Sequence, residues 1–319
     1  MPEFRPPVGL RSPHLQTLLA RMPTKASKRH VTGVCTERAI LDCRDGIRLE
    51  AWVTPLRTDA PLVIILHGWL GDSRSWYVER TARVLHAGGF RVASLLLRDH
   101  GGTAAHNREM FNSARLGEVI DACNALADGC DSVGIVGFSL GGNFALRLAS
   151  DPGADSSVKA CLAVSPVIDP ARTVRAIDAG WLVYRKWFVA KWRRALKEKQ
   201  DAFPQEYRAL DGALRLSTVA GITDFLVERY LPYRDSIDYY ARYDLRGDRL
   251  AQVGIDTRIV AARDDMMIPA DSYADITPND RVDLHVFDHG GHCGFIEDWR
   301  LNAYLDGVVV EYFDRRLIG

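Results

Sequence analysis

The sequence predicts an α/β fold in which a mostly parallel β-sheet carries helices on both faces. Strand-like apolar runs alternate with helical segments from about residue 38 to residue 164. The run "PLVIILHG" (61–68) is almost continuously apolar, which is typical of a strand covered on both faces. Strand patterns return after residue 255, so the C-terminal part is expected to complete the same sheet.

The first part of the chain supplies most of these elements in order. The segment "GIRLEAWV" (46–53) alternates apolar and polar residues, as a half-buried strand does. A helical stretch near 76–87 ends at Gly88 and Gly89, and "FRVASLLL" is the next strand. Further along we expect helix 115–127, strand 132–136, helix 141–149 and strand 158–164.

The alternation then breaks, because residues from about 166 to 240 are helical and aromatic without a clear strand. Strand patterns resume at "DTRIVAA" and "RVDLHVF", and a last helix is expected near 298–315. We therefore expect residues 1–165 and 241–319 to form one discontinuous core. Residues 166–240 would be a helical cap or lid inserted on the sheet.

Composition excludes several classes of protein. The 41 Lys and Arg residues balance the 41 Asp and Glu residues, which argues against a dedicated nucleic-acid binder. The cysteines lack CxxC pairing and are expected to be the reduced thiols of a cytoplasmic protein; they are Cys35, Cys43, Cys123, Cys130, Cys161 and Cys293. Neither a signal peptide nor a membrane span is predicted.

The stretch "VGIVGFSLGG" (133–142) places Ser139 between a strand and a helix, flanked by Gly137 and Gly141. A tight structural turn would explain these glycines, and the five-residue pattern alone is not specific. The position after a buried strand matches the nucleophile elbow of the α/β-hydrolase arrangement, in which the serine is followed along the chain by an acid and then a histidine. Ser139 is therefore the predicted nucleophile.

Candidates for the acid and the base follow two later strands. Asp264 and Asp265 come directly after "RIVAA", and one of them would orient the histidine while the other caps the turn. "VFDHGGHCGF" supplies His292, flanked by small residues, as the base. His67, His100 and His289 would hold loops, and His289, His292 and Cys293 lack a zinc-like ligand pair elsewhere.

An oxyanion formed during acyl transfer needs two backbone N–H groups. The residue after the nucleophile, Leu140, would supply one of them, and the loop "HGWLGD" would supply the other from Trp69.

With these residues placed, the chain resembles the YheT-like branch of the α/β-hydrolases, which is related to the animal ABHD lipid hydrolases. The motifs that carry the resemblance are "FRPPVGLRSPHLQT", "HGWLGD", "GFSLGGN", the basic aromatic stretch near 184–199, "DSIDYY", "ARDDMMIP" and "GGHCGF". In that pattern the aspartate four residues before the proline is the triad acid, which is Asp265 here. The resemblance implies an esterase or lipase that acts on acyl esters without a cofactor.

The segment "WLVYRKWFVAKWRRALKEKQ" (181–200) sets four aromatic residues on one helical face: Trp181, Tyr184, Phe188 and Trp192. This stripe would line an acyl pocket. The basic residues around it would touch anionic lipid, or the helix would simply pack on the sheet with a solvated outer face. The basic residues are Arg185, Lys186, Lys191, Arg193, Arg194, Lys197 and Lys199.

The leading functional hypothesis is a serine hydrolase that cleaves carboxylic esters of an acyl or lipid-like kind through a Ser-His-Asp triad and an acyl-enzyme; the expected partner is a small-molecule acyl ester. Acyl transfer or thioester cleavage by the same acyl-enzyme is an alternative of the same class. A binding protein that kept the fold without catalysis is an alternative of a different class.

Overall fold

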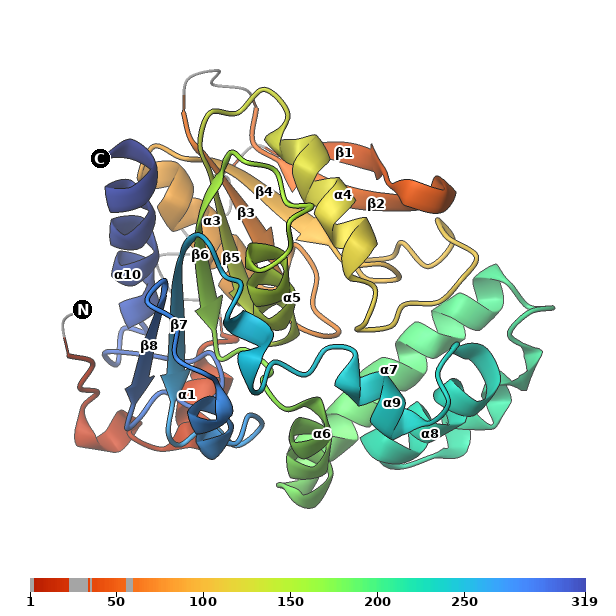
Figure 1. The fold of residues 1–319 in the computed structure, drawn as a ribbon. Coiled ribbons are helices and arrows are strands. Elements are labelled where there is room, and N and C mark those ends of the chain that lie inside the picture. Colours follow the sequence, from red (N-terminus) through yellow and green to blue (C-terminus); the bar gives the residue numbers. More distant parts are fainter. Residues whose placement is uncertain (1–2, 23–33, 35, 56–59) are drawn as a thin grey trace.

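The computed structural model describes residues 3–22, 34, 36–55 and 60–319. Within them the chain forms an eight-stranded sheet with the strand order β1-β2-β4-β3-β5-β6-β7-β8 (Figure 1). The strands are β1 (Glu37–Asp42), β2 (Arg48–Val53), β3 (Leu62–Leu66), β4 (Arg91–Leu96), β5 (Val133–Phe138), β6 (Val158–Val164), β7 (Asp256–Ala262) and β8 (Val282–Phe287).

The sheet is mostly parallel, which confirms the predicted fold class. Neighbouring strands run parallel from β4 through β3, β5, β6 and β7 to β8, and only the pairs β1–β2 and β2–β4 are antiparallel. Parallel neighbours align their carboxyl ends at one edge of the sheet. The loops that follow β3, β5, β6, β7 and β8 therefore meet at that edge.

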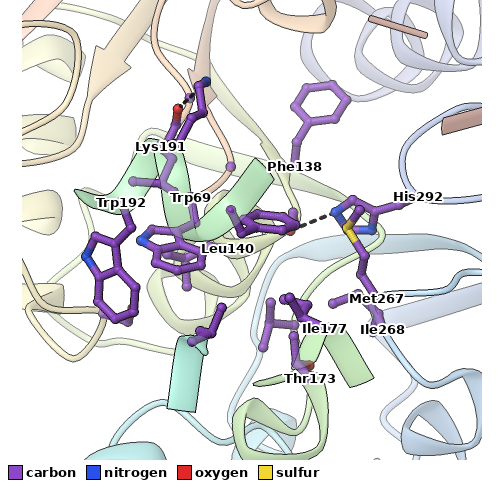
Figure 2. Close-up of a pocket in the computed structure, with 18 of the residues that line it drawn as sticks. Trp69, Phe138, Leu140, Thr173, Ile177, Lys191, Trp192, Met267, Ile268 and His292 are labelled. Atoms are coloured by element: carbon purple, nitrogen blue, oxygen red, sulfur yellow. Dashed lines mark hydrogen bonds between the residues drawn. The ribbon is translucent and has the colours of Figure 1, made fainter. Parts of the chain in front are cut away.

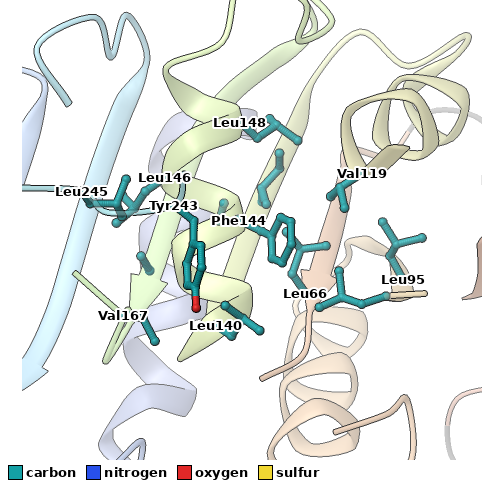
Figure 3. Packing of buried hydrophobic residues seen from close by; sticks show 14 of the residues in the cluster. Leu66, Leu95, Val119, Leu140, Phe144, Leu146, Leu148, Val167, Tyr243 and Leu245 are labelled. Atoms are coloured by element: carbon teal, nitrogen blue, oxygen red, sulfur yellow. The ribbon is translucent and has the colours of Figure 1, made fainter. Parts of the chain in front are cut away.

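The core lies on both faces of the sheet, and strand β3 shows why its sequence lacks alternation. Its residues are all buried, with Leu62, Ile64 and Leu66 in one apolar cluster and Val63 and Ile65 in the other. Helices α4 (Leu116–Ala127) and α5 (Leu140–Ala149) pack on the first face, where Phe144 and Leu148 meet strand residues such as Leu66 (Figure 3). Helices α3 (Trp76–Ala87) and α10 (Tyr304–Phe313) cover the second face.

The last helix begins later than its pattern predicts. Helix α10 starts at Tyr304, whereas the sequence favoured a helix from about residue 298. The carboxylate of Asp298 accepts hydrogen bonds from the backbone N–H groups of Arg300 and Asn302, and Leu301 has a φ of 64°. This local hydrogen bonding competes with the helix and holds residues 298–302 in a turn.

Helices α6 (Pro170–Ala179), α7 (Leu182–Ala202), α8 (Val219–Tyr230) and α9 (Ser236–Ala241) follow β6 and precede β7. They gather beside the sheet edge where the parallel strands end (Figure 1). Across the described residues, no helix is both long enough and apolar enough to cross a membrane. The described cysteines Cys43, Cys123, Cys130, Cys161 and Cys293 are free thiols, and Cys35 lies outside the described residues.

Candidate active site

Ser139 occupies a sharp turn between β5 and α5. Its backbone has a φ of 54°, a conformation that a residue with a side chain adopts only where the surroundings enforce it. A Cβ atom on Gly137 would lie 2.2 Å from the carbonyl oxygen of Gly141, and one on Gly141 would lie 2.3 Å from that of Leu66. Both glycines are therefore required by close backbone contact, and the turn presents the serine at the carboxyl end of β5.

A chain of hydrogen bonds joins the three residues that the sequence singled out. The Nε2 atom of His292 lies 3.0 Å from Ser139 Oγ (Figure 2), and its Nδ1 atom lies 2.8 Å from Asp265 Oδ2. Because a carboxylate only accepts, Nδ1 carries the proton and Nε2 is left to accept from the serine hydroxyl. The residues come from three loops that are distant in sequence, and the fold brings them together.

The electrostatics of His292 depend on Asp265. Burial by itself would lower the pKa of the imidazole, but Asp265 and Cys293 together outweigh it, so that the pKa of His292 is raised above its ordinary value. The other oxygen of Asp265 accepts hydrogen bonds from the backbone N–H groups of Met267 and Ile268, at 2.8 and 3.1 Å. The carboxylate is thus fixed from both sides and stabilises the imidazolium that forms when His292 takes a proton.

Asp264 has a different task, although it is the neighbour of Asp265. Its Oδ1 atom accepts a 2.8 Å hydrogen bond from the backbone N–H of Gly291, and its Oδ2 atom lies 3.6 Å from His289 Nδ1. Burial raises the pKa of Asp264. The sequence expected one aspartate to orient the histidine and the other to cap its own turn. The structure has Asp264 reach across to the histidine loop instead.

The loop after β3 leaves one of its N–H groups without a partner. Gly68 N–H donates to the Tyr77 hydroxyl, Leu70 N–H donates to His100 Nε2, and Gly71 N–H donates to the Gly68 carbonyl. Within the described part of the chain, neither Trp69 N–H nor Leu140 N–H donates a hydrogen bond. These two N–H groups are the pair that the sequence assigned to the oxyanion.

Two buried histidines shape this loop, as the sequence anticipated for His67 and His100. The Nε2 atom of His67 accepts from Leu97 N–H at 3.1 Å, and that of His100 accepts from Leu70 N–H at 3.1 Å. Burial lowers the pKa of His67 to about 4 and the pKa of His100 to about 3. Both rings therefore stay neutral near neutral pH and serve as acceptors.

Ser139 and His292 open onto a cavity of about 550 Å³, a size suited to a small organic ligand. Its walls come from the strand-end loops and from helices α6 to α9, and most of the residues are apolar. The residues that bound it away from the strand ends include Thr173, Ile177, Phe188, Trp192, Val219, Leu226, Leu231, Tyr239 and Tyr243. Figure 2 shows Trp69, Leu140, Ile177, Met267 and Ile268 arranged around this space.

The aromatic stripe predicted on 181–192 is divided by the structure. Phe188 and Trp192 line the cavity and contact Trp69, with ring centroids 5.6 and 4.7 Å apart. Trp181 and Tyr184 are outside the lining and pack on His14, with centroids 4.6 and 5.8 Å apart. The division arises because α1 (Pro13–Leu19) packs against the first turn of α7, which sequence periodicity could not reveal.

The basic residues of the same helix do not form one solvated face. Lys199 is buried, where its ammonium donates to Asp99 Oδ1 and to the carbonyls of Ala104, Asn107 and Glu109. Arg193 donates to the carbonyl of Leu216, while Arg194 and Lys197 are exposed and pair with Glu198 and Asp201. Lys199 therefore ties the loop after β4 to α7.

Helix α1 is the part of the site that sequence reasoning missed. The buried side chain of Gln16 donates to the carbonyls of Leu10 and Ile296 and accepts from Ile296 N–H. Thr17 Oγ1 accepts a 2.9 Å hydrogen bond from His292 N–H. Ser12 followed by Pro13 is a helix-start signal, but seven residues are too few to show which face is buried. The N-terminal motif thus holds the histidine loop.

Comparison with known proteins agrees with this architecture. The sequence pattern of the alpha/beta hydrolase fold family matches residues 61–298. The chain is 26% identical over 307 residues to the Escherichia coli (strain K12) protein named "Putative esterase YheT", covering 92% of this chain and 87% of that protein. It is 23% identical over 266 residues to an abhydrolase domain-containing protein of Dictyostelium discoideum, covering 80% of this chain and 67% of that protein.

Solved structures share the fold at lower sequence identity. The Pyrococcus furiosus esterase Pf2001 superposes with a TM-score of 0.59 at 16% identity, covering 93% of this chain and 98% of that one. The serine hydrolase CCSP0084 of Cycloclasticus zankles gives 0.57 at 17% identity, covering 88% and 98%. The family match supports a hydrolase activity, and the predicted resemblance to the YheT-like branch is confirmed. The chain therefore belongs to the alpha/beta hydrolase fold family.

Proposed function

We propose that the protein is a serine hydrolase that cleaves carboxylic esters with an apolar acyl group. The observation that carries this proposal is the hydrogen-bond chain from Ser139 through His292 to Asp265 at the wall of a largely apolar cavity. A hydroxyl is a poor nucleophile until a neighbouring base takes its proton. His292 Nε2 is the base within reach, and Asp265 fixes the tautomer that leaves Nε2 free to accept.

The proposed reaction has two halves. Ser139 Oγ bonds to the ester carbonyl carbon while His292 takes the hydroxyl proton, and the bond to the alcohol oxygen then breaks as His292 returns that proton to it. Water next attacks the acyl-enzyme, again losing its proton to His292, and the acid leaves as Ser139 regains its hydrogen. The N–H groups of Trp69 and Leu140 hold the carbonyl oxygen when it bears a negative charge.

The segment 166–240 is proposed to act as a cap over this site. Its helices supply the apolar side chains that face Ser139 across the cavity, among them Ile177, Phe188 and Leu226. An acyl chain lying against them would gain about 0.8 kcal/mol for each buried CH₂ group. The cap would thereby select esters by the length of the acyl chain.

Labelling with a fluorophosphonate probe tests this function directly. Wild type should lose hydrolysis of nitrophenyl butyrate on labelling, and peptide mass spectrometry should locate the label on Ser139. Ser139→Ala should remove labelling and lower kcat by about 10³-fold or more. Ser150→Ala, at the other end of the same helix, is the control and should keep both. Normal turnover by a folded Ser139→Ala variant would rule the mechanism out.

A further inference from the structure

One corner of the cavity carries positive charge, in contrast to its apolar walls. Arg21 follows α1, and Lys191 lies on α7 at the rim of the cavity, where it is exposed. Both cations contact the indole of Trp187: the guanidinium carbon lies 4.5 Å from the ring centroid and the ammonium nitrogen lies 4.9 Å from it. A single ring therefore brings two cations from different elements to one place.

These cations have no carboxylate partner in the described part of the chain. Lys191 Nζ donates to the carbonyl of Leu70 at 3.0 Å (Figure 2), and neither side chain forms an ion pair there. Among the other cations of α7, Arg194, Lys197 and Lys199 each have an acidic partner. Arg185 and Arg193 donate to backbone carbonyls instead. Arg21 is partly buried, and a cation removed from water is costly unless an opposite charge accompanies it.

One acidic residue lies near this charge: Asp72 favours the charged form of Lys191, but no ion pair joins it to either cation in the described part of the chain. Among the described residues that line the cavity, Asp72 alone is acidic, against Arg21, Arg74 and Lys191. One Asp72 oxygen already accepts from Arg74 N–H and Ser75 Oγ, which holds the turn. Burial lowers the pKa of Arg21, and the groups that act against burial are Tyr77, Cys293 and Tyr184, none of them a carboxylate.

Arg21 lies on the histidine side of the nucleophile, whereas Lys191 lies against the carbonyl of Leu70 in the loop after β3. Arg21 comes four residues after Thr17, whose hydroxyl holds His292 N–H. It is also close enough to Cys293, the neighbour of His292, for the two groups to interact electrostatically. Because His292 Nε2 must hand its proton to the departing alcohol, that alcohol leaves on this side.

We propose that the alcohol part of the substrate carries an anionic group, a carboxylate or a phosphate, which Arg21 and Lys191 bind. This inference rests on the proposed ester hydrolysis and narrows its substrate class to an apolar acyl ester of an acidic alcohol. Arg21 offers the fork of N–H donors that matches carboxylate and phosphate oxygens, and Lys191 adds a point charge from the rim. The anionic group itself is unchanged by the reaction.

A matched pair of esters tests the proposal. The substrates are 4-(butyryloxy)benzoate, which is anionic, and its methyl ester, which is neutral; both release a phenol that absorbs in the ultraviolet. The readout is the ratio of kcat/KM for the anionic ester to that for the neutral ester. Arg21→Gln and Lys191→Gln should each lower this ratio about tenfold or more, because each removes a charge-assisted hydrogen bond.

Charge-keeping and surface variants provide the controls. Arg21→Lys and Lys191→Arg keep the charge and should lower the ratio less than the Gln variants do. Arg194→Gln, which removes an exposed charge from the same helix, should leave the ratio at the wild-type value. The corresponding phosphate, 4-(butyryloxy)phenyl phosphate, distinguishes the two anions. A ratio in Arg21→Gln and Lys191→Gln equal to that in Arg194→Gln overturns the proposal.

A binding arm separates this inference from the proposed function. Calorimetry with 4-(butyryloxy)benzoate on the Ser139→Ala protein needs no turnover, and adding Lys191→Gln or Arg21→Gln should weaken binding about tenfold. If the Ser139→Ala protein still hydrolyses esters, the proposed function is wrong. If hydrolysis requires Ser139 but the ratio is the same in wild type, Arg21→Gln and Lys191→Gln, only this inference is wrong. A third outcome concerns lipid. If Arg21→Gln and Lys191→Gln leave the ratio unchanged but abolish binding to phosphatidylglycerol vesicles, with phosphatidylcholine vesicles as the reference, the cations bind a lipid surface and the inference is overturned.

Discussion

Thr17 Oγ1 accepts a 2.9 Å hydrogen bond from the backbone N–H of His292, a residue 275 positions further along the chain. Both groups are buried, so the hydroxyl satisfies an N–H that water could not reach. The contact fixes the backbone of the base and leaves the imidazole to Asp265 and Ser139. The N-terminal helix is therefore part of what positions the proposed catalytic histidine.

Replacing Thr17 tests this positioning role. Thr17→Val keeps the shape of the side chain but leaves His292 N–H unpaired, so we expect kcat for ester hydrolysis to fall about tenfold. Thr17→Ser keeps the acceptor and should recover most of the rate. Substrate binding should change little, so the loss should appear in kcat and not in KM. Equal rates for the Val and Ser variants would show that the contact is only structural.

Asp265→Asn should damage catalysis far more than Asp264→Asn. We expect Asp265→Asn to lower kcat about 10³- to 10⁴-fold, because an amide in place of the carboxylate favours the wrong tautomer of His292. Asp264→Asn changes the group that accepts from Gly291 N–H and lies beside His289, without touching His292, and the loss should stay within about tenfold. Reversed magnitudes in a direct comparison of kcat would exchange the two assignments.

The same pair of variants predicts a shift in the pH profile. His292 acts as a base only when neutral, so kcat/KM should rise as pH rises through the pKa of His292. The Asp265 carboxylate raises that pKa, whereas burial lowers it. Removing the carboxylate should therefore move the acidic limb of the profile to lower pH. The limb of Asp264→Asn should remain near that of wild type, and a limb common to all three proteins would contradict the role of Asp265.

Selection by acyl length should depend on the cavity wall and not on the whole aromatic stripe. Phe188→Ala and Leu226→Ala enlarge the wall, so kcat/KM should fall more for C6–C8 esters than for acetate. Leu226 lies on α8, so its variant shows whether the effect of Phe188→Ala comes from the cavity wall or from a disturbed contact with Trp69. Tyr184→Leu is the control, since Tyr184 packs on His14 outside the lining and should affect all esters alike. The series runs from C2 to C12, and variant-to-wild-type ratios that stay constant along it would exclude this wall as the acyl site.

Lys199 should contribute to stability through the loop after β4. Lys199→Met leaves Asp99 largely buried without its cation, and we expect a loss of about 3–5 kcal/mol in the free energy of unfolding. Lys197→Met removes an exposed ion pair two residues away and should cost less than about 1 kcal/mol. Adding Asp99→Asn to Lys199→Met should recover part of the loss. Denaturant unfolding of the four proteins measures this, and similar midpoints for Lys197→Met and Lys199→Met would refute it.

The sequence determined the fold class and indicated the three residues of the proposed triad, because each of them lies in a recognisable local sequence pattern. A buried strand is recognised by its apolar run. The turn at Ser139 requires glycine at positions 137 and 141, because the neighbouring backbone leaves no room for a Cβ atom there. The position of His292 on a loop of small residues after the last strand was predictable for the same reason. Such signals lie within a few residues of the feature they predict.

Tertiary structure alone decided the contacts between segments distant in the chain. The packing of α1 against the first turn of α7 divided the aromatic stripe of that helix: Trp181 and Tyr184 pack on His14, while Phe188 and Trp192 line the cavity. The loop after β4 buries Lys199 against Asp99, whereas Lys191 lies beside Arg21 and Trp187. Helical periodicity shows which residues share a face, but it does not show what that face meets. Lys199 and Lys191 have the same side chain on the same helix. Their neighbours, which come from distant parts of the chain, decide that Lys199 holds a loop and that Lys191 lies at the cavity rim, where we propose that it binds an anion.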